Sequence, residues 1–78
     1  MEFTAGQIAD FIKGRVEGDM NAKVHTFAKI EEGVPGAISF LSSPKYAHFL
    51  ESTEATIVLV DDSIKIDKAV KPTLIFVE

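Results

Sequence analysis

The stretch Gly36-Ala-Ile-Ser-Phe-Leu-Ser-Ser-Pro-Lys-Tyr46 decides the fold of this chain. Its first half, residues 37–41, is short and mostly apolar, which predicts a β-strand. Ser43 can cap a following helix, and Pro44 suits the first helical position because its missing N–H would have no partner there. We therefore expect a strand that turns directly into a helix, with hydroxyls, free backbone N–H groups and an aromatic ring at the turn.

The residues before this stretch encode a helix near the N-terminus. Thr4 can cap it, and Gln7 at the third helical position completes a capping box. Gly14 provides the expected stop, so we predict a helix over about residues 5–13. Large apolar residues recur at helical spacing and predict its inner face: Ile8, Phe11 and Ile12.

Further strands are predicted on both sides of the central stretch. Residues 15–18 indicate a short strand with a turn at Gly18-Asp19, and residues 24–30 alternate with period two, which predicts another. The segments 56–60 and 73–77 are continuously apolar, which is typical of strands covered on both faces. The sequence therefore predicts an α/β fold, with a small mixed sheet and two main helices.

Composition narrows the class of protein. The chain has 78 residues, which suits one domain, and a net charge of −4. This charge argues against nucleic-acid binding, which needs clustered Lys and Arg. Acids interrupt the one loose group of lysines, Lys65, Lys68 and Lys71, which we interpret as a solvated edge.

Cysteine content, the length of apolar runs and the N-terminal sequence indicate where the protein is located. The chain has no cysteine, so it can form neither a disulfide nor a thiolate metal site. No apolar run is long enough to span a bilayer, and the N-terminus lacks the basic and apolar regions of a secretory signal. We therefore expect a cytoplasmic protein without a membrane span.

No self-contained active site is visible. His25 and His48 are isolated from any ligand or triad pattern, and we expect an exposed strand residue and an exposed helix residue. The serines lack the context of a nucleophile elbow, and the glycines form no phosphate-binding fingerprint. We predict no catalytic residue, no metal site and no cofactor.

The turn after the central strand is the remaining candidate. Phe40 and Tyr46 could stack on a base, while Lys45 and the N–H groups of a helix start favour an anion. The alternative is purely structural: Phe40 belongs to the core, and Tyr46 packs with Phe49 and Leu50 on one helical face.

At these residues the chain resembles the N-terminal domain of the UDP-3-O-(3-hydroxyacyl)glucosamine N-acyltransferases of bacterial lipid A synthesis. The matching elements are Phe3-Thr-Ala-Gly-Gln-Ile-Ala9, Gly18-Asp19, Ile30-Glu-Glu-Gly-Val-Pro-Gly-Ala-Ile-Ser-Phe-Leu41 and Ser43-Pro-Lys-Tyr46. The resemblance covers essentially the whole chain. It implies a fold similar to the N-terminal domains of Mur ligases.

The resemblance also implies a role for the turn. In this family the aromatic residue matching Phe40 and the tyrosine matching Tyr46 flank the uracil of a UDP-sugar. An asparagine that hydrogen-bonds the base is Ser43 here, which offers one hydroxyl in place of an amide. The implied substrate-binding residues are Phe40, Ser43, Lys45 and Tyr46.

The parent reaction of the family moves a 3-hydroxyacyl group from acyl carrier protein to the amine of UDP-3-O-acylglucosamine in Gram-negative bacteria. Its catalytic histidine lies in a hexapeptide-repeat β-helix that is absent from these 78 residues. The carrier-protein contacts and the trimer interface of the family also lie in segments that these residues lack. We therefore expect residues 1–78 to be one domain, an N-terminal fragment that is monomeric and not catalytic by itself. The alternative is a stand-alone structural or interaction domain that binds no nucleotide.

Overall fold

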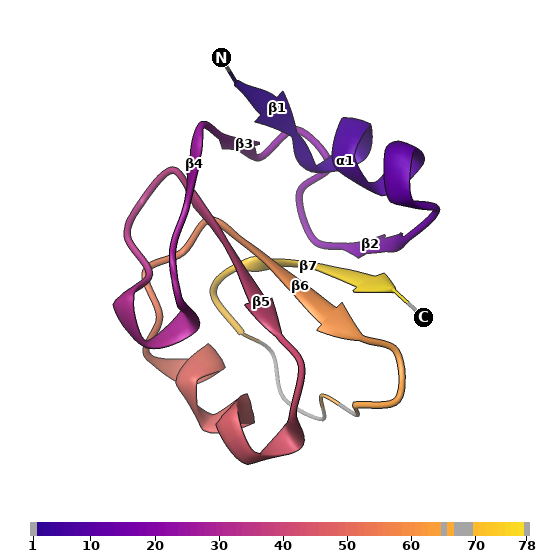
Figure 1. The fold of residues 1–78 in the computed structure, drawn as a ribbon. Helices are drawn as coiled ribbons and strands as arrows, with labels where there is room; N and C mark the ends of the chain where they lie inside the picture. The colour runs from indigo at the N-terminus through magenta and orange to yellow at the C-terminus, as the bar shows by residue number, and fades with distance from the viewer. Residues whose placement is uncertain (1, 65, 67–69, 78) are drawn as a thin grey trace.

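The computed structural model describes residues 2–64, 66 and 70–77. A five-stranded sheet runs through the molecule in the order β2-β7-β6-β5-β4 (Figure 1). These strands span, in that order, Arg15–Glu17, Thr73–Val77, Ile57–Asp61, Ala37–Leu41 and Thr26–Phe27. β2 is antiparallel to β7, and the other neighbours are parallel, so the predicted mixed α/β sheet is confirmed. A separate antiparallel pair joins β1 (Phe3–Thr4) to β3 (Lys23–Val24).

The helix α1 (Ala5–Ile12) begins at the predicted capping box. The Thr4 N–H donates to Gln7 Oε1 over 2.9 Å, and the Gln7 N–H donates to Thr4 Oγ1 over 3.1 Å. The helix ends at Lys13, whose φ of 59° is left-handed, so the prediction that Gly14 provides the stop is wrong. Gly14 serves close packing instead, since a Cβ there would lie 2.7 Å from Ile75 Cγ2.

The inner face of α1 also differs from the prediction. Ala5 and Ala9 are buried, whereas Phe11 is 89% exposed and Ile12 is 38% exposed. The two alanines pack with Ile57 and Ile75 of the sheet. Small side chains allow the helix to lie close to the strands. Of the three predicted residues, Ile8 is partly buried and packs against this cluster, whereas Phe11 and Ile12 are left exposed.

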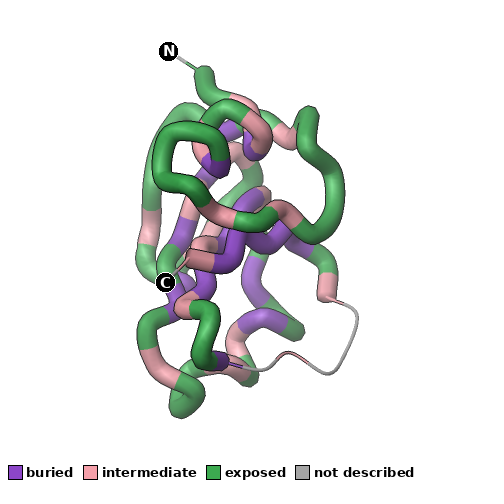
Figure 2. The backbone as a smooth tube through the Cα atoms, turned by 90° about the vertical axis from the view of Figure 1, so that its right-hand side faces the viewer, coloured by how far each residue is buried: buried purple, intermediate pink, exposed green. Residues whose placement is uncertain are grey.

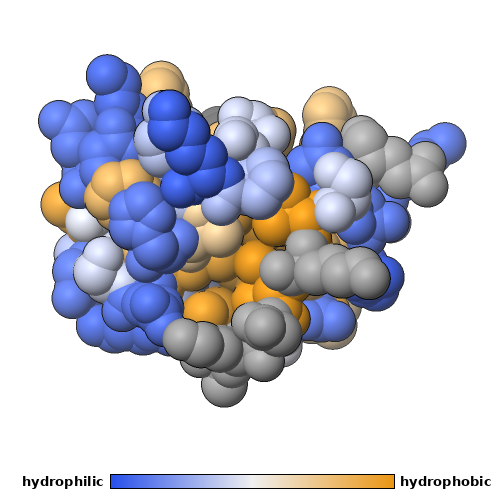
Figure 3. All heavy atoms as spheres, turned by 90° about the horizontal axis from the view of Figure 1, so that it is seen from below, coloured by the Kyte–Doolittle hydropathy of each residue, from blue (hydrophilic) through white to orange (hydrophobic). Residues whose placement is uncertain are grey.

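The central strands are buried on both faces, as predicted from their continuous apolar runs. Ile57 packs on the α1 side, while the neighbouring Val58 packs on the opposite side, and both have no exposed surface. Figure 2 shows this buried interior as the purple part of the tube. Leu50, 1% exposed, covers the second face from η2 (Pro44–Glu51). At the end of the molecule far from α1, apolar side chains gather in a hollow between hydrophilic ones (Figure 3).

Residues 24–30 do not form the single strand predicted from their alternation. The chain bends at His25 between β3 and β4, and then enters the 3₁₀ helix η1 (Ile30–Glu32). The bend arises because β3 pairs with β1 whereas β4 pairs with β5 in the other sheet. The predicted helix after Ser43 is present as η2, but it is a 3₁₀ helix.

Candidate functional site

A groove of about 660 Å³ lies beyond the carboxyl ends of β4 and β5. One wall is the segment 27–32, which leaves β4 and continues through η1. The other side is formed by the end of β5, residues 40–42, and by Tyr46 in the first turn of η2. The carboxyl ends of parallel strands are where open α/β sheets place their ligands. This groove follows that rule, although it lies at the edge of the sheet.

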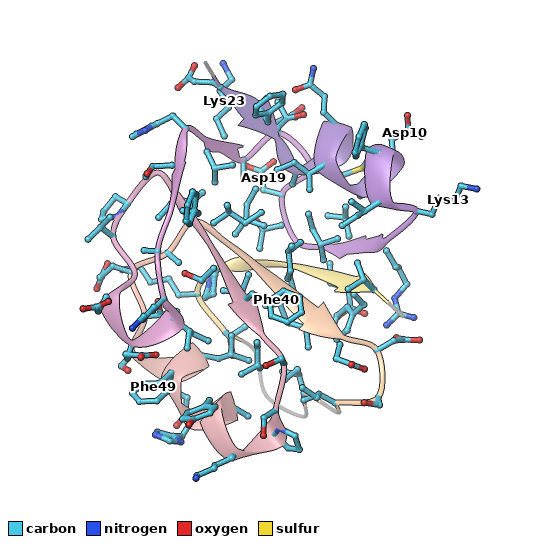
Figure 4. The ribbon with its side chains drawn as sticks, in the orientation of Figure 1. Asp10, Lys13, Asp19, Lys23, Phe40 and Phe49 are labelled. Carbon is cyan, nitrogen blue, oxygen red and sulfur yellow. The ribbon has the colours of Figure 1, made fainter. Side chains whose placement is uncertain are left out.

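The groove brings together two of the four predicted site residues. Phe40 is 52% exposed and stands on the face of β5 turned toward the viewer in Figure 4. Tyr46 is 43% exposed, and its ring stacks on Phe49 with 6.1 Å between centroids. The interpretation of Phe40 as a core residue is therefore wrong, while Tyr46 both packs within η2 and borders the groove.

Ser43 and Lys45 lie next to the groove and do not line it. The Ser43 hydroxyl accepts a hydrogen bond from the Lys45 N–H over 3.3 Å, so it serves as the predicted helix cap. The Lys45 ammonium is 5.8 Å from the centre of the Tyr46 ring. A positive charge is thus held beside an aromatic wall of the groove.

The backbone N–H groups of this turn are less available to an anion than the sequence predicted. The Lys45 N–H donates to Ser43 Oγ, and the Tyr46 N–H donates to the Ser43 carbonyl over 3.1 Å. Both groups were expected to be free for an anion. They are already hydrogen-bonded, because the 3₁₀ turn and the serine cap use them.

The η1 side of the groove carries opposed charges. Lys29, Glu31 and Glu32 all line it, which leaves one excess negative charge among the lining residues. This wall disfavours a phosphate group and suits the neutral part of a ligand. The groove therefore combines aromatic surface with an acidic wall, and Lys45 places a positive charge beside Tyr46.

Phe27 is a groove residue that the sequence reasoning missed. It lines the wall opposite Tyr46 and is 85% exposed. A signal was present, because Phe27 falls in the polar phase of the 24–30 alternation, with His25 and Lys29. A single exposed aromatic residue is common, and Phe27 indicates a binding surface only together with Phe40 and Tyr46, which the structure brings to the same groove.

The other candidates lie elsewhere. His25 is exposed at the bend before β4, and His48 is exposed on η2, where its ring is 4.3 Å from that of Phe49. Lys71 pairs with Glu54 over 2.7 Å, while Lys65 and Lys68 fall outside the described residues. Across residues 2–64, 66 and 70–77, no cluster of three or more potential metal ligands occurs.

No helix that the structure describes has the length and apolar character needed to cross a bilayer. The pKa of Asp61 is lowered by hydrogen bonds from the Ser63 backbone N–H and the Ser63 hydroxyl, over 2.9 and 2.7 Å. Asp61 ends β6, outside the groove.

Comparison with known proteins places this domain in a family. The profile described as UDP-3-O-(3-hydroxymyristoyl) glucosamine N-acyltransferase, LpxD, matches residues 21–78. Relatives named UDP-3-O-acylglucosamine N-acyltransferase are 62% identical in Phocaeicola vulgatus and 56% identical in Bacteroides thetaiotaomicron, both over the whole chain. The chain spans only 22% of the length of each of these relatives. The chain thus belongs to the LpxD family of UDP-3-O-acylglucosamine N-acyltransferases, of which it matches the N-terminal part.

Proposed function

We propose that this domain holds the uracil nucleotide end of a UDP-glucosamine-type substrate in the groove beyond β4 and β5. The observation that carries the proposal is that Phe40 and Tyr46 line the same groove, on the side opposite η1. Two partly exposed aromatic rings that border the same space can stack on a planar base. The acidic wall at η1 favours the uncharged base and ribose there, with the phosphates elsewhere.

The longer protein to which such a domain belongs would act as an N-acyltransferase of lipid A synthesis in the cytoplasm. Its relatives carry the name UDP-3-O-acylglucosamine N-acyltransferase. We infer that it transfers a 3-hydroxyacyl group from acyl carrier protein to the substrate amine, as a trimer. In this proposal the 78 residues contribute binding energy and orientation, because holding the nucleotide fixes where the sugar amine can lie. The isolated chain is then a monomer without acyltransferase activity.

A titration of the isotopically labelled 78-residue chain with UDP, followed by NMR, tests this proposal. We expect weak, saturable binding in the millimolar range, about −4 kcal/mol, with amide shifts clustered at residues 40–46. Saturable shifts confined to another surface would contradict the placement. A complete lack of binding would favour the alternative, a structural or interaction domain that binds no nucleotide.

A substitution at the helix cap sharpens the test. Ser43 now uses its hydroxyl to accept from the Lys45 N–H, and it does not line the groove. Ser43→Asn keeps a good cap and adds an amide with both a donor and an acceptor. We expect tighter UDP binding by up to about 1 kcal/mol, the value of one added hydrogen bond. Unchanged affinity in a folded Ser43→Asn chain would show that the base is not recognised from this position.

A further inference from the structure

Phe27 has no packing role that explains an aromatic residue at its position. It is 85% exposed and belongs to neither hydrophobic cluster of the described residues. Among those residues, its ring also makes neither an aromatic pair nor a cation–π contact. Exposure alone would not point to a ligand, since Phe11 is 89% exposed as well, but Phe27 lines the same groove as Phe40 and Tyr46, and such a gathered aromatic surface indicates a binding site.

The strand register places Phe27 on the same face of the sheet as Phe40. Phe27 pairs with Ile38 across the parallel strands β4 and β5, so these two side chains share a face. Phe40 follows Ile38 by two residues and lies on that face as well. Neighbouring strands lie about 4.8 Å apart and two residues advance about 6.6 Å along a strand, so such diagonal neighbours are about 8 Å apart, within reach of aromatic rings. One flat ligand can therefore contact both residues.

The charges next to these rings favour one orientation of a nucleotide in the groove. Glu31 and Glu32 lie on the same wall of the groove as Phe27, whereas Lys45 lies beyond Tyr46 on the other side. A phosphate is repelled from the first side and attracted to the second. A nucleotide should thus place its uncharged part near Phe27 and its phosphates toward Lys45.

We propose that Phe27 is a third aromatic residue contacting the nucleoside, and that Glu31 and Glu32 orient the ligand by keeping its phosphates away from η1. This inference rests on the proposed nucleotide binding. It adds a residue of β4 that contacts the nucleoside, and it gives an electrostatic reason why the nucleotide binds with its phosphates away from η1.

The test compares two exposed phenylalanines in the full 78-residue chain. Phe27→Ala removes the ring at the groove, and Phe11→Ala removes an 89% exposed ring on α1 that does not line it. We expect Phe27→Ala to weaken both UDP and uridine at least about fivefold, because the lost contact is to the nucleoside. Phe11→Ala should bind as the parent chain does, and Phe27→Tyr should largely restore affinity. Denaturation curves should show that both alanine variants remain as stable as the parent.

A variant without the two acidic charges of η1 tests the proposed orientation of the nucleotide. Replacing Glu31→Gln and Glu32→Gln together should tighten UDP binding and leave uridine binding unchanged, with the gain shrinking at high salt. If the double variant tightened uridine equally, charge repulsion would not be the cause and the orientation would be overturned.

The outcomes for Phe27 separate this inference from the proposed function. If UDP shifts residues 40–46 while Phe27→Ala and Phe11→Ala bind alike, the role of Phe27 is refuted and the proposed function stands. If the parent chain binds neither UDP nor uridine, both the proposed function and this inference are overturned.

Discussion

Replacing Gly33 by alanine should destabilise the domain through a steric conflict behind the groove. Gly33 follows η1 with φ −59° and ψ 139°, a conformation open to any residue, so its backbone gives no reason for glycine. The reason is space. An added Cβ would overlap Thr53 Oγ1 and lie 2.9 Å from the Ala55 nitrogen. Thr53 is 6% exposed, so it has little room to move away.

The magnitude follows from two costs. Overpacking a buried site costs about 1–3 kcal/mol. Displacing Thr53 Oγ1 also removes the acceptor of the Ala55 N–H, now 3.2 Å away, and an unsatisfied buried donor costs about 1–3 kcal/mol. Because partial relaxation lowers the sum, we expect Gly33→Ala to reduce the free energy of unfolding by about 2–4 kcal/mol. That is a large share of the stability of a small domain.

Urea denaturation of parent and variant measures this change as a lower midpoint with an unchanged slope. Gly6→Ala is the matched control, because a Cβ there would lie 3.4 Å from the Met20 carbonyl oxygen, an ordinary contact. Alanine in a helix should then stabilise by up to about 1 kcal/mol. A double-mutant cycle with Thr53→Ala provides a second check, since removing the obstructing side chain should make the combined loss smaller than the sum. A loss below 0.5 kcal/mol for Gly33→Ala (about the size of a neutral surface change) would refute the reasoning.

Three further predictions concern single groups. Ser39 Oγ is buried without a hydrogen-bond partner among the described residues, so Ser39→Ala should raise stability by about 1 kcal/mol, and a lower urea midpoint would contradict this. Thr4→Ala removes the acceptor for the Gln7 N–H and should cost about 1 kcal/mol, to be measured by thermal unfolding against a Thr4→Ser control. The lowered pKa of Asp61 contributes stability that is present above the unfolded value, about 3.9, and is lost as pH falls through the folded value. Ser63→Ala removes the hydroxyl donor and keeps the backbone N–H, so it should raise the Asp61 pKa in part in an NMR titration, and an unchanged curve would rule out the hydroxyl hydrogen bond as a cause.

Local signals predicted much of the fold. The capping box at Thr4 and Gln7 and the strand Ala37–Leu41 were found as predicted, because short-range hydrogen bonds and continuous apolar runs determine them. The double-sided burial of β6 also followed from its composition. These elements agree with their tertiary context, and sequence reasoning works best where such agreement holds.

The wrong predictions have a common cause in tertiary pairing. The alternation over 24–30 fits a single strand. However, β3 pairs with β1 and β4 pairs with β5 of the other sheet, so the chain bends at His25. On α1, three large apolar residues indicated the inner face, but only Ile8 packs partly buried there, because Ala5 and Ala9 make the close contact with the sheet. Neither the choice of pairing partner nor the distance between layers is encoded in local periodicity.

Part of the candidate site could be predicted from the sequence. Phe40 and Tyr46 were singled out, and the structure brings both to one groove, where nucleotide binding stays a prediction. Phe27 and the acidic wall at η1 were missed, because the strand register and the course of the chain after β4 bring them there. Separate segments build the groove, and sequence spacing does not reveal which segments meet.

The position of β7 has a consequence for how this domain is made in the cell. β7 comes last among the strands, yet it lies between β2 and β6 and joins them. While the ribosome is still synthesising residues 73–77, β2 has no partner in the sheet and α1 lacks the Ile75 contact beneath it. The sheet therefore cannot be completed until most of the domain has been translated. Until then its earlier strands stay exposed to solvent. Pairing over such sequence separations slows folding and leaves apolar strands exposed until β7 is available.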